Sequence, residues 1–361
     1  MVVVVAALAA GAVLWAALPA HSAVAELSPQ QLAGQRVVYS YSGLKPPASL
    51  LRRIRAGEAA GVIFFGENIS SRSQIRGVVD KLQQAATQSP VKAPLLMMTD
   101  QEGGQVRRLP GAPALSEKQI GASTDPASAA RQAGRGAGRN LKGVGMNVNL
   151  APVLDVFRTP GDFIDQFGRS YSMNPKTVAR LGGAFIRTQQ RTGVAATAKH
   201  FPGLGAATRT QNTDERPVTL RLSRGTLRTV DERPYTSAIS SGAHLVMVSW
   251  ARYPALDKHR PAGLSSAVVR GELRKRLGFT GVTVTDALEA GALRAYGPVS
   301  NRAVLAAGAG MDLVLCSGRS VSQGKSAVTA LAQALQQGRL GRSAFVASVK
   351  RVDALRSALA Q

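Results

Sequence analysis

The sequence is short of the residues on which several common chemistries depend. Its 361 residues include a single cysteine, Cys316, and four histidines. One cysteine cannot form an internal disulfide, and Cys316, at the end of the apolar run 311–316, is expected to be a small core residue. The chain has no His-Glu-x-x-His sequence and no cysteine pair, so we predict no metal site and no cofactor. It also has no Gly-x-Ser-x-Gly sequence, which leaves a serine hydrolase without support.

Acidic and aromatic residues are also scarce. There are 21 Asp and Glu against 45 Lys and Arg, which gives a formal net charge of +24. These charges either cover solvated helix faces or attract anionic polymers, such as those of a cell wall. Nucleic-acid sites interleave basic residues with aromatic ones, and aromatic residues make up only 5% of this chain. We therefore predict no specific nucleic-acid partner.

The first 25 residues contain no Lys, Arg, Asp or Glu. Residues 2–18 are almost wholly apolar, and Ala23-Val24-Ala25 matches a small-x-small cleavage site. This pattern predicts either a secretory signal peptide or an uncleaved N-terminal membrane anchor. Both favour export, to an extracellular, cell-wall or membrane-anchored location, with membrane contact only through this segment. Residues 26–361 contain no linker or repeat and are predicted to form one domain.

Short apolar runs bounded by Gly or Pro predict buried parallel strands. Helical patterns separate most of them, and two of these helices open with a cap followed by proline, at Asp125-Pro126 and Asn174-Pro175. Eight such units fit a single (β/α)8 TIM-type barrel better than an open doubly wound sheet. No Gly-x-Gly-x-x-Gly follows the first run, which disfavours a dinucleotide site. The eight runs are 36–42, 60–66, 93–99, 146–154, 194–199, 243–250, 281–286 and 311–316.

Polar residues of catalytic type follow several of these runs. Asp100, the pair Lys199-His200 and Asp286 each stand at the end of a predicted strand, and Arg169 lies on a loop after another. In a barrel, the carboxyl ends of the strands meet at one face, which carries the active site. Core packing does not explain four such coincidences. The sequence therefore predicts a site for a polar ligand at this face.

Five ordered motifs at these strand ends resemble glycoside hydrolase family 3, in its single-domain β-N-acetylhexosaminidase branch. The resemblance implies a retaining glycosidase that releases terminal β-linked N-acetylglucosamine (GlcNAc) without a cofactor. The motifs are Thr-Asp-Gln-Glu-Gly-Gly-Gln-Val-Arg-Arg at 99–108, Asn-Leu-Ala-Pro-Val-Leu-Asp at 149–155, Lys-His-Phe-Pro-Gly at 199–203, Tyr-Pro-Ala-Leu-Asp at 253–257 and Gly-Phe-Thr-Gly-Val-Thr-Val-Thr-Asp-Ala-Leu at 278–288.

The resemblance also implies roles for individual residues. Asp286 matches the nucleophile that forms a covalent glycosyl-enzyme, although a carboxylate at this position could alternatively cap a helix. Glu102 and Asp155 are interpreted as groups that fix the loops and the binding residues. The residues that match the family's GlcNAc-binding positions are Asp100, Arg108, Arg169, Lys199 and His200.

One departure from the family concerns the general acid/base. The family uses a His, paired with an Asp two residues earlier, on the loop after Lys-His-Phe-Pro-Gly. Those positions are Asn212 and Thr210 here, and the family's His in Pro-Gly-His-Gly is Leu204. Asparagine cannot transfer a proton, and loss of general acid catalysis costs about 10²–10⁴-fold in rate. The nearest candidate is Asp214, which is otherwise a solvated loop charge.

The expected function is therefore an exported β-N-acetylglucosaminidase acting on peptidoglycan fragments or chitin oligosaccharides, with Asp286 as nucleophile and Asp214 as acid/base. Two alternatives remain open. The missing His favours a sugar-binding protein with weakened catalysis, and a family 3 β-glucosidase-like hydrolase would share the same motifs.

Overall fold

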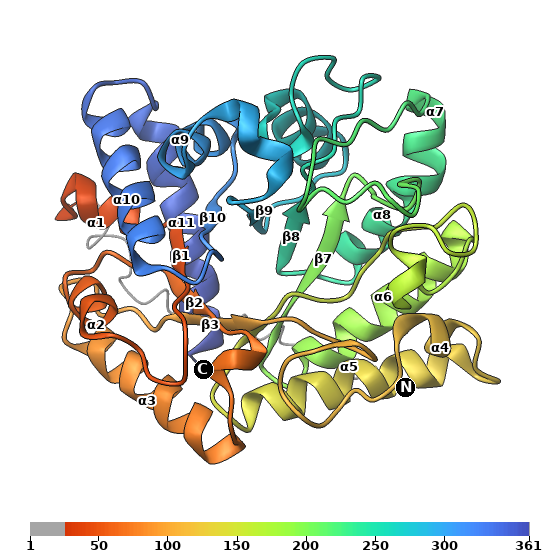
Figure 1. Ribbon diagram of the computed structural model, residues 1–361, viewed down its shortest axis with the longest axis horizontal. Helices are drawn as coiled ribbons and strands as arrows, with labels where there is room; N and C mark the ends of the chain where they lie inside the picture. Colours follow the sequence, from red (N-terminus) through yellow and green to blue (C-terminus); the bar gives the residue numbers. More distant parts are fainter. Residues whose placement is uncertain (1–25, 361) are drawn as a thin grey trace, which may run out of the picture.

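The computed structural model describes residues 26–360, so the predicted signal peptide or anchor lies outside the described residues. Eight parallel strands close into a barrel in the order β1-β10-β9-β8-β7-β6-β3-β2 (Figure 1). The prediction of a (β/α)8 barrel is confirmed, and each of the eight apolar runs overlaps one strand, although β7 and β9 extend beyond the predicted ends. The strands are β1 Val37–Tyr39, β2 Gly61–Ile63, β3 Leu96–Thr99, β6 Val148–Asn149, β7 Ala195–Phe201, β8 Leu245–Val248, β9 Val282–Ala287 and β10 Leu313–Leu315.

Alternation along the strands divides the core into two layers. In β8, Leu245 and Met247 belong to the cluster inside the barrel. Val246 and Val248 belong to the layer between strands and helices. Successive strand side chains point to opposite faces, and here both faces are buried. This is why the strands read as continuous apolar runs rather than as alternating ones.

The outer helices begin where the sequence predicts. Asp125 accepts a hydrogen bond from Ser128 N at the start of α5, and Asn174 accepts one from Lys176 N at the start of α6. A π-type helix, η6 Ala267–Arg276, precedes β9. The α-helices are α1 Pro29–Gly34, α2 Ala48–Arg55, α3 Arg72–Thr87, α4 Glu117–Gly121, α5 Pro126–Lys142, α6 Pro175–Gln190, α7 Arg224–Thr226, α8 Arg233–Ser240, α9 Val299–Ala309, α10 Val321–Gln336 and α11 Arg342–Leu359.

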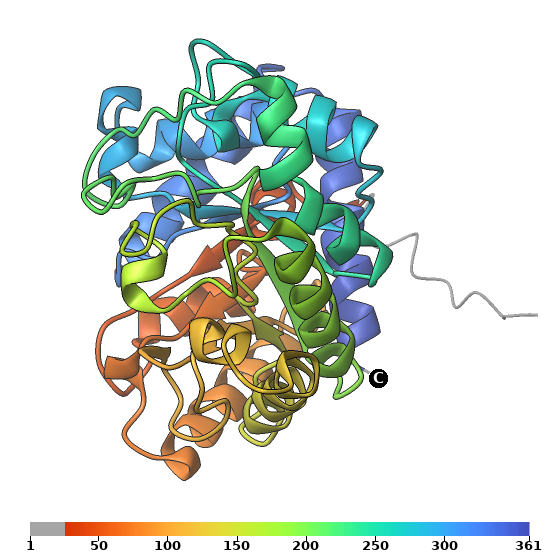
Figure 2. The same cartoon turned by 90° about the vertical axis from the view of Figure 1, so that its right-hand side faces the viewer.

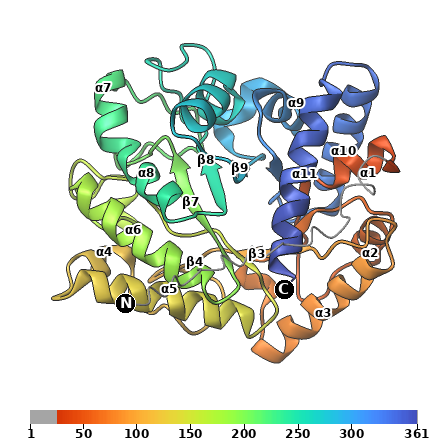
Figure 3. The same cartoon turned by 180° about the vertical axis from the view of Figure 1, so that it is seen from behind.

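The last helix covers the amino-terminal end of the barrel. Val352 and Leu355 of α11 join the apolar cluster inside the barrel. Arg351 binds Asp312, just before β10, with its Nη2 2.8 Å from Oδ1. Figure 3 shows α11 in front of the strands, and in the side view of Figure 2 the loops that follow the strands project to the opposite side. Only the carboxyl end of the barrel is therefore left open.

A small antiparallel hairpin, β4 Gln101–Gly103 with β5 Val106–Arg107, follows β3. The hairpin carries most of the motif at 99–108 and turns it back over the barrel end.

Cys316 is a buried free thiol, as expected. Among the helices of residues 26–360, none is both long and apolar enough to cross a membrane.

Candidate active site

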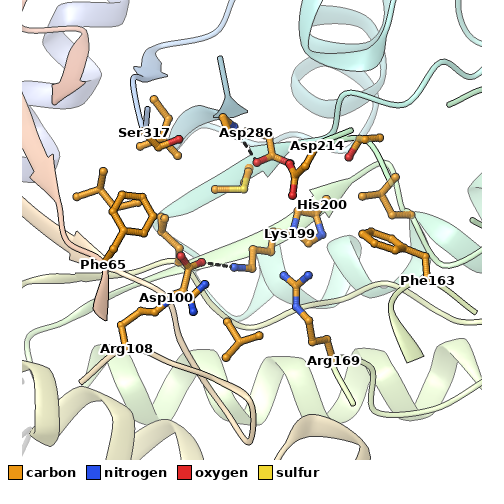
Figure 4. A pocket seen from close by; sticks show the side chains of 18 residues that line it. Phe65, Asp100, Arg108, Phe163, Arg169, Lys199, His200, Asp214, Asp286 and Ser317 are labelled. Atoms are coloured by element: carbon orange, nitrogen blue, oxygen red, sulfur yellow. Dashed lines mark hydrogen bonds and ion pairs between the residues drawn. The ribbon is translucent and has the colours of Figure 1, made fainter. Parts of the chain in front are cut away.

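A cavity of about 220 Å³ lies at the carboxyl ends of the strands (Figure 4). It is smaller than the roughly 300–1,000 Å³ of sites for drug-sized ligands, so its size suits one sugar ring better than an extended chain. The structure brings all the candidate residues of the sequence together in its wall. These are Asp100, Arg108, Arg169, Lys199, His200, Asp214 and Asp286.

Lys199, on β7, is held between two carboxylates. Its Nζ lies 2.7 Å from Asp100 Oδ1 and 2.7 Å from Glu102 Oε1. Only 1% of the residue is exposed. Burial alone would lower the pKa of Lys199, but the charges of Asp100 and Glu102 outweigh it and raise the pKa. Lys199 is therefore a fixed positive charge in the floor of the cavity.

Glu102 connects Lys199 to Arg169. The Nε and Nη2 atoms of Arg169 donate to the two oxygens of Glu102, each at 2.8 Å. Burial raises the pKa of Glu102, but the charges of Arg169 and Lys199 dominate and lower it to about 2. Glu102 itself does not line the cavity. Glu102 therefore holds the two cations, Lys199 and Arg169, in position.

Asp155 orients His200 in the same way. Its Oδ2 lies 2.8 Å from Nδ1 of His200, and its Oδ1 accepts a hydrogen bond from Leu204 N at 2.7 Å. Asp155 is fully buried. The contact occupies Nδ1, which leaves Nε2 of His200 as the nitrogen available to the cavity.

Asp286 stands near the end of β9 and faces the cavity. Its Oδ1 accepts a hydrogen bond from the backbone nitrogen of Ala287 at 2.7 Å. The strand runs through Ala287, and the next helical segment, η7, begins only at Gly291. The alternative that Asp286 caps a helix is therefore wrong. Its carboxylate is free to contact a ligand.

Asp214 reaches the cavity from the loop after β7. The loop is attached to η7, because the carbonyl oxygen of Asp214 accepts a hydrogen bond from Gly291 N at 2.7 Å and that of Thr213 accepts one from Ala292 N at 3.0 Å. The backbone nitrogen of Asp214 donates to Asn212 Oδ1 at 2.9 Å. These bonds fix the backbone on both sides of the carboxyl group.

The environment of Asp214 favours its protonated form. Its side chain is exposed to the open cavity, but the surrounding protein raises the pKa to about 6, and the nearby charge of Asp286 adds to the rise. The charges of His200 and Arg169 oppose the shift. Figure 4 shows the carboxyl groups of Asp214 and Asp286 pointing toward each other. Asp214 therefore lies in the pocket wall instead of being a loop charge in bulk solvent.

The positions of the family's usual His and Asp lie elsewhere. Neither Asn212 nor Thr210 lines the cavity. The Asn212 side chain instead donates to Glu215 Oε1 at 3.0 Å and so stabilises the turn. Leu204, which replaces another family His, does line the cavity and contributes an apolar surface.

Sequence reasoning missed most of the apolar lining. Phe65 and Ser317 lie at or just after the end of a predicted apolar run, so their position at a strand end could have identified them. They were missed because neither belongs to one of the five motifs. Arg108 was identified, and within residues 26–360 its Nε is buried without a hydrogen-bond partner. The additional lining residues are Ile63, Phe65, Val106, Leu150, Phe163, Leu204, Thr213, Met247, Ala287, Leu315 and Ser317.

Residues 26–360 contain no group of three or more His, Cys, Asp or Glu side chains placed to hold a metal ion. The buried ionisable groups around the cavity instead pair with one another, Glu102 with Arg169 and Lys199, and Asp155 with His200.

Comparison with known proteins connects this geometry to a family. The family model described as the glycosyl hydrolase family 3 N-terminal domain matches residues 28–355. An uncharacterized secreted glycosyl hydrolase of Arthroderma benhamiae is 48% identical over 95% of this chain and 97% of its own length. A β-hexosaminidase of Xanthomonas campestris pv. campestris is 33% identical over 79% of this chain and 86% of its own length.

Similar solved structures belong to the same group of enzymes. The family 3 β-N-acetylglucosaminidase from Paenibacillus sp. str. FPU-7 is 36% identical with a TM-score of 0.87, over 92% of this chain and 63% of that one. The β-N-acetylhexosaminidase from Beutenbergia cavernae is 30% identical with a TM-score of 0.83, over 92% of this chain and 99% of that one. The chain therefore belongs to glycosyl hydrolase family 3 and is a β-N-acetylhexosaminidase-like glycosidase.

Proposed function

We propose that this chain is a retaining β-N-acetylglucosaminidase with Asp286 as nucleophile and Asp214 as general acid/base. One observation carries the proposal: Asp214 and Asp286 share one cavity, and the pKa of Asp214 is raised to about 6. A retaining glycosidase needs an ionised nucleophile and a protonated acid at the scissile bond, and in most families both are carboxyl groups. Two carboxyl groups with different environments meet that requirement.

The reaction then takes two steps. Asp286 attacks the anomeric carbon, the bond to the leaving oxygen breaks, and Asp214 gives its proton to that oxygen. Water then attacks the anomeric carbon of the glycosyl-enzyme, Asp214 takes a proton from the water, and the Asp286 carboxylate leaves. The enzyme returns to its starting state with the sugar released.

The remaining polar groups are proposed to bind the non-reducing GlcNAc. Asp100 accepts hydrogen bonds from sugar hydroxyls, Lys199 donates to them, and His200 Nε2 donates or accepts according to its tautomer. Arg108, with an unpartnered buried Nε among the described residues, offers donors to the ligand, and Arg169 supplements it. Because Glu102 already holds Lys199 and Arg169, and Asp155 holds His200, these three side chains need little ordering when the sugar binds.

The natural substrates are proposed to be peptidoglycan fragments or chitin oligosaccharides with a terminal GlcNAc. Relatives named β-hexosaminidase and β-N-acetylglucosaminidase support the sugar. Export is supported by the uncharged, apolar residues 1–25 and by the name of the secreted relative. N-terminal sequencing of protein recovered from the culture medium would distinguish cleavage near Ala25 from an uncleaved segment.

The test compares two substrates and two variants. A nitrophenyl β-N-acetylglucosaminide has a leaving group that departs without protonation, whereas N,N'-diacetylchitobiose requires the acid. Asp286→Ala should lose both activities, and Asp214→Ala should lose mainly the disaccharide. Saturable GlcNAc binding by a wild-type protein that cleaves neither substrate would instead establish a sugar-binding protein. Faster cleavage of the matching glucoside would indicate a β-glucosidase.

A further inference from the structure

Two neighbouring outer helices carry positive charges that form no ion pair within residues 26–360. Together α5 and α6 contain seven Lys and Arg residues and no Asp or Glu. Figures 1 and 3 show them side by side on the outside of the barrel. We propose that the groove between these helices binds a linear polyanion with repeated phosphate groups, away from the catalytic cavity.

The cations of α5 form one stripe along the helix. They are Arg131, Arg135, Arg139 and Lys142, all exposed. Residues three and four apart share a helix face, so these side chains stand about 6 Å apart along the axis. A regular row of charges suits a polymer with repeating charges better than a single small anion.

The groove itself is formed by a close approach of the two helices. A Cβ atom at Gly134 of α5 would lie 2.3 Å from the carbonyl oxygen of Phe185 in α6, so only glycine permits this packing. The resulting groove has a volume of about 520 Å³. Four cations line it, three from α5 and one from the end of α6, and no carboxylate does. These cations are Arg135, Arg139, Lys142 and Arg191.

Several arginines on other outer helices are paired, although single exposed ones such as Arg52 and Arg342 form no ion pair within residues 26–360. Arg53 binds Glu58 at 2.6 Å, and Arg228 binds Glu272 at 2.6 Å. Within residues 26–360 the four groove cations form no ion pair. Like charges at i,i+4 destabilise a helix. A bound polyanion would reverse the sign of that contribution.

The helix dipole explains only part of the pattern. Arg139 and Lys142 lie in the last turn of α5, where a cation interacts favourably with the carbonyl end. Arg131 and Arg135 lie further back, beyond the reach of this effect. The dipole therefore does not account for a stripe that runs along the helix.

Phosphate is the anion that the groove chemistry favours. Arginine binds phosphate through two parallel hydrogen bonds, and three of the four lining cations are arginines. No aromatic residue lines the groove, so the bases of a nucleic acid would find no stacking partner. The groove lies toward the carboxyl ends of α5 and α6, which lead into the starts of β6 and β7. A polymer bound there leaves the cavity at the other end of the barrel open.

The experiment measures binding of long-chain inorganic polyphosphate to the full chain over a range of NaCl concentrations. The groove variant R135Q/R139Q/K142Q is compared with R52Q/R342Q/K350Q, which removes the same charges from exposed positions of α2 and α11. We expect the groove variant to bind at least about tenfold more weakly at low salt. The slope of its log binding constant against log salt concentration should be smaller in magnitude than that of the wild type by about 2. Hydrolysis of the nitrophenyl substrate should stay unchanged in both variants.

Several outcomes would overturn the proposal. Equal losses in the two variants would show that net charge alone attracts the polymer. If orthophosphate displaced the bound polymer as well as free polyphosphate does at the same total phosphate concentration, the groove would be a site for a single anion. Tighter binding of single-stranded DNA or of anionic phospholipid vesicles would assign the groove to another partner. As an independent readout in the wild type, polyphosphate should protect the Lys142 amine from acetylation more than that of Lys350.

Discussion

The substitution Gly291→Ala tests whether the position of Asp214 sets the rate. A Cβ atom at residue 291 would lie 2.0 Å from the carbonyl oxygen of Glu215 and 2.9 Å from that of Asp214. Real Cβ atoms essentially never approach other heavy atoms closer than 3.0 Å, so the loop must move by about 1 Å. The hydrogen bond from Gly291 N to Asp214 O would be lost with this movement. The carboxyl group of Asp214 would follow its backbone.

A misplacement of 1 Å costs about 10²-fold when a catalytic group must meet a reacting atom. We therefore expect kcat/KM of Gly291→Ala for N,N'-diacetylchitobiose to fall about 100-fold. The nitrophenyl substrate should be affected much less, because its leaving group needs no proton. Steady-state kinetics on both substrates, below the melting temperature of the variant, provide the measurement.

The matched control is Gly77→Ala in α3, where an added Cβ finds open space within 4 Å. That variant should keep wild-type activity and gain slightly in helix stability. The reasoning would be refuted if Gly291→Ala kept its disaccharide activity, or if both substrates lost activity equally. An equal loss would mean that the substitution disturbs Asp286 or the whole cavity rather than proton transfer.

The charges of the site lead to three further predictions. Because Asp214 must be protonated to act as an acid and its pKa is about 6, disaccharide kcat/KM should fall above pH 6 in the wild type, and Asp214→Asn should lack this limb. Asp286→Asn removes a charge that raises the pKa of Asp214, so carboxyl NMR titration should give a lower pKa in that variant; an unchanged value would contradict the coupling. Glu102→Gln leaves Lys199 and Arg169 with one fewer buried anion and should lower the free energy of unfolding by about 3–5 kcal/mol in chemical denaturation. Since the pKa of Glu102 falls from 4.5 to about 2 on folding, the wild type should itself lose this stabilisation as the pH drops through that range.

The sequence was sufficient for the barrel because local patterns decide it. Parallel strands buried on both faces must be apolar throughout, and helix caps such as Asp125-Pro126 are local signals. The covering of the barrel end by α11 was not predicted. It depends on contacts such as that of Arg351 with Asp312, which lie 39 positions apart and follow no local pattern.

The same distinction holds for the candidate site. Residues at strand ends, such as Lys199 and Asp286, could be located because the barrel topology brings strand ends together. Asp214 lies on a long loop, where spacing does not determine position. Its place depends on the bond to Gly291, 77 residues later, and on the close approach that glycine allows there. The ion pairs through Glu102 and Asp155 likewise required the structure.

The electrostatic coupling of the two carboxyl groups suits both steps of the proposed reaction. Before attack, the negative charge of Asp286 helps to keep a proton on Asp214, which must act as an acid. In the glycosyl-enzyme, Asp286 is a neutral ester, so this cause of the raised pKa disappears while the opposing charges of His200 and Arg169 remain. The pKa of Asp214 then falls, and the group becomes the carboxylate that the second step needs as a base. In the proposed reaction a carboxyl group on an anchored loop can thus serve in place of the family's His, because burial raises its pKa most and the charge of Asp286 adds a contribution that is present only before attack.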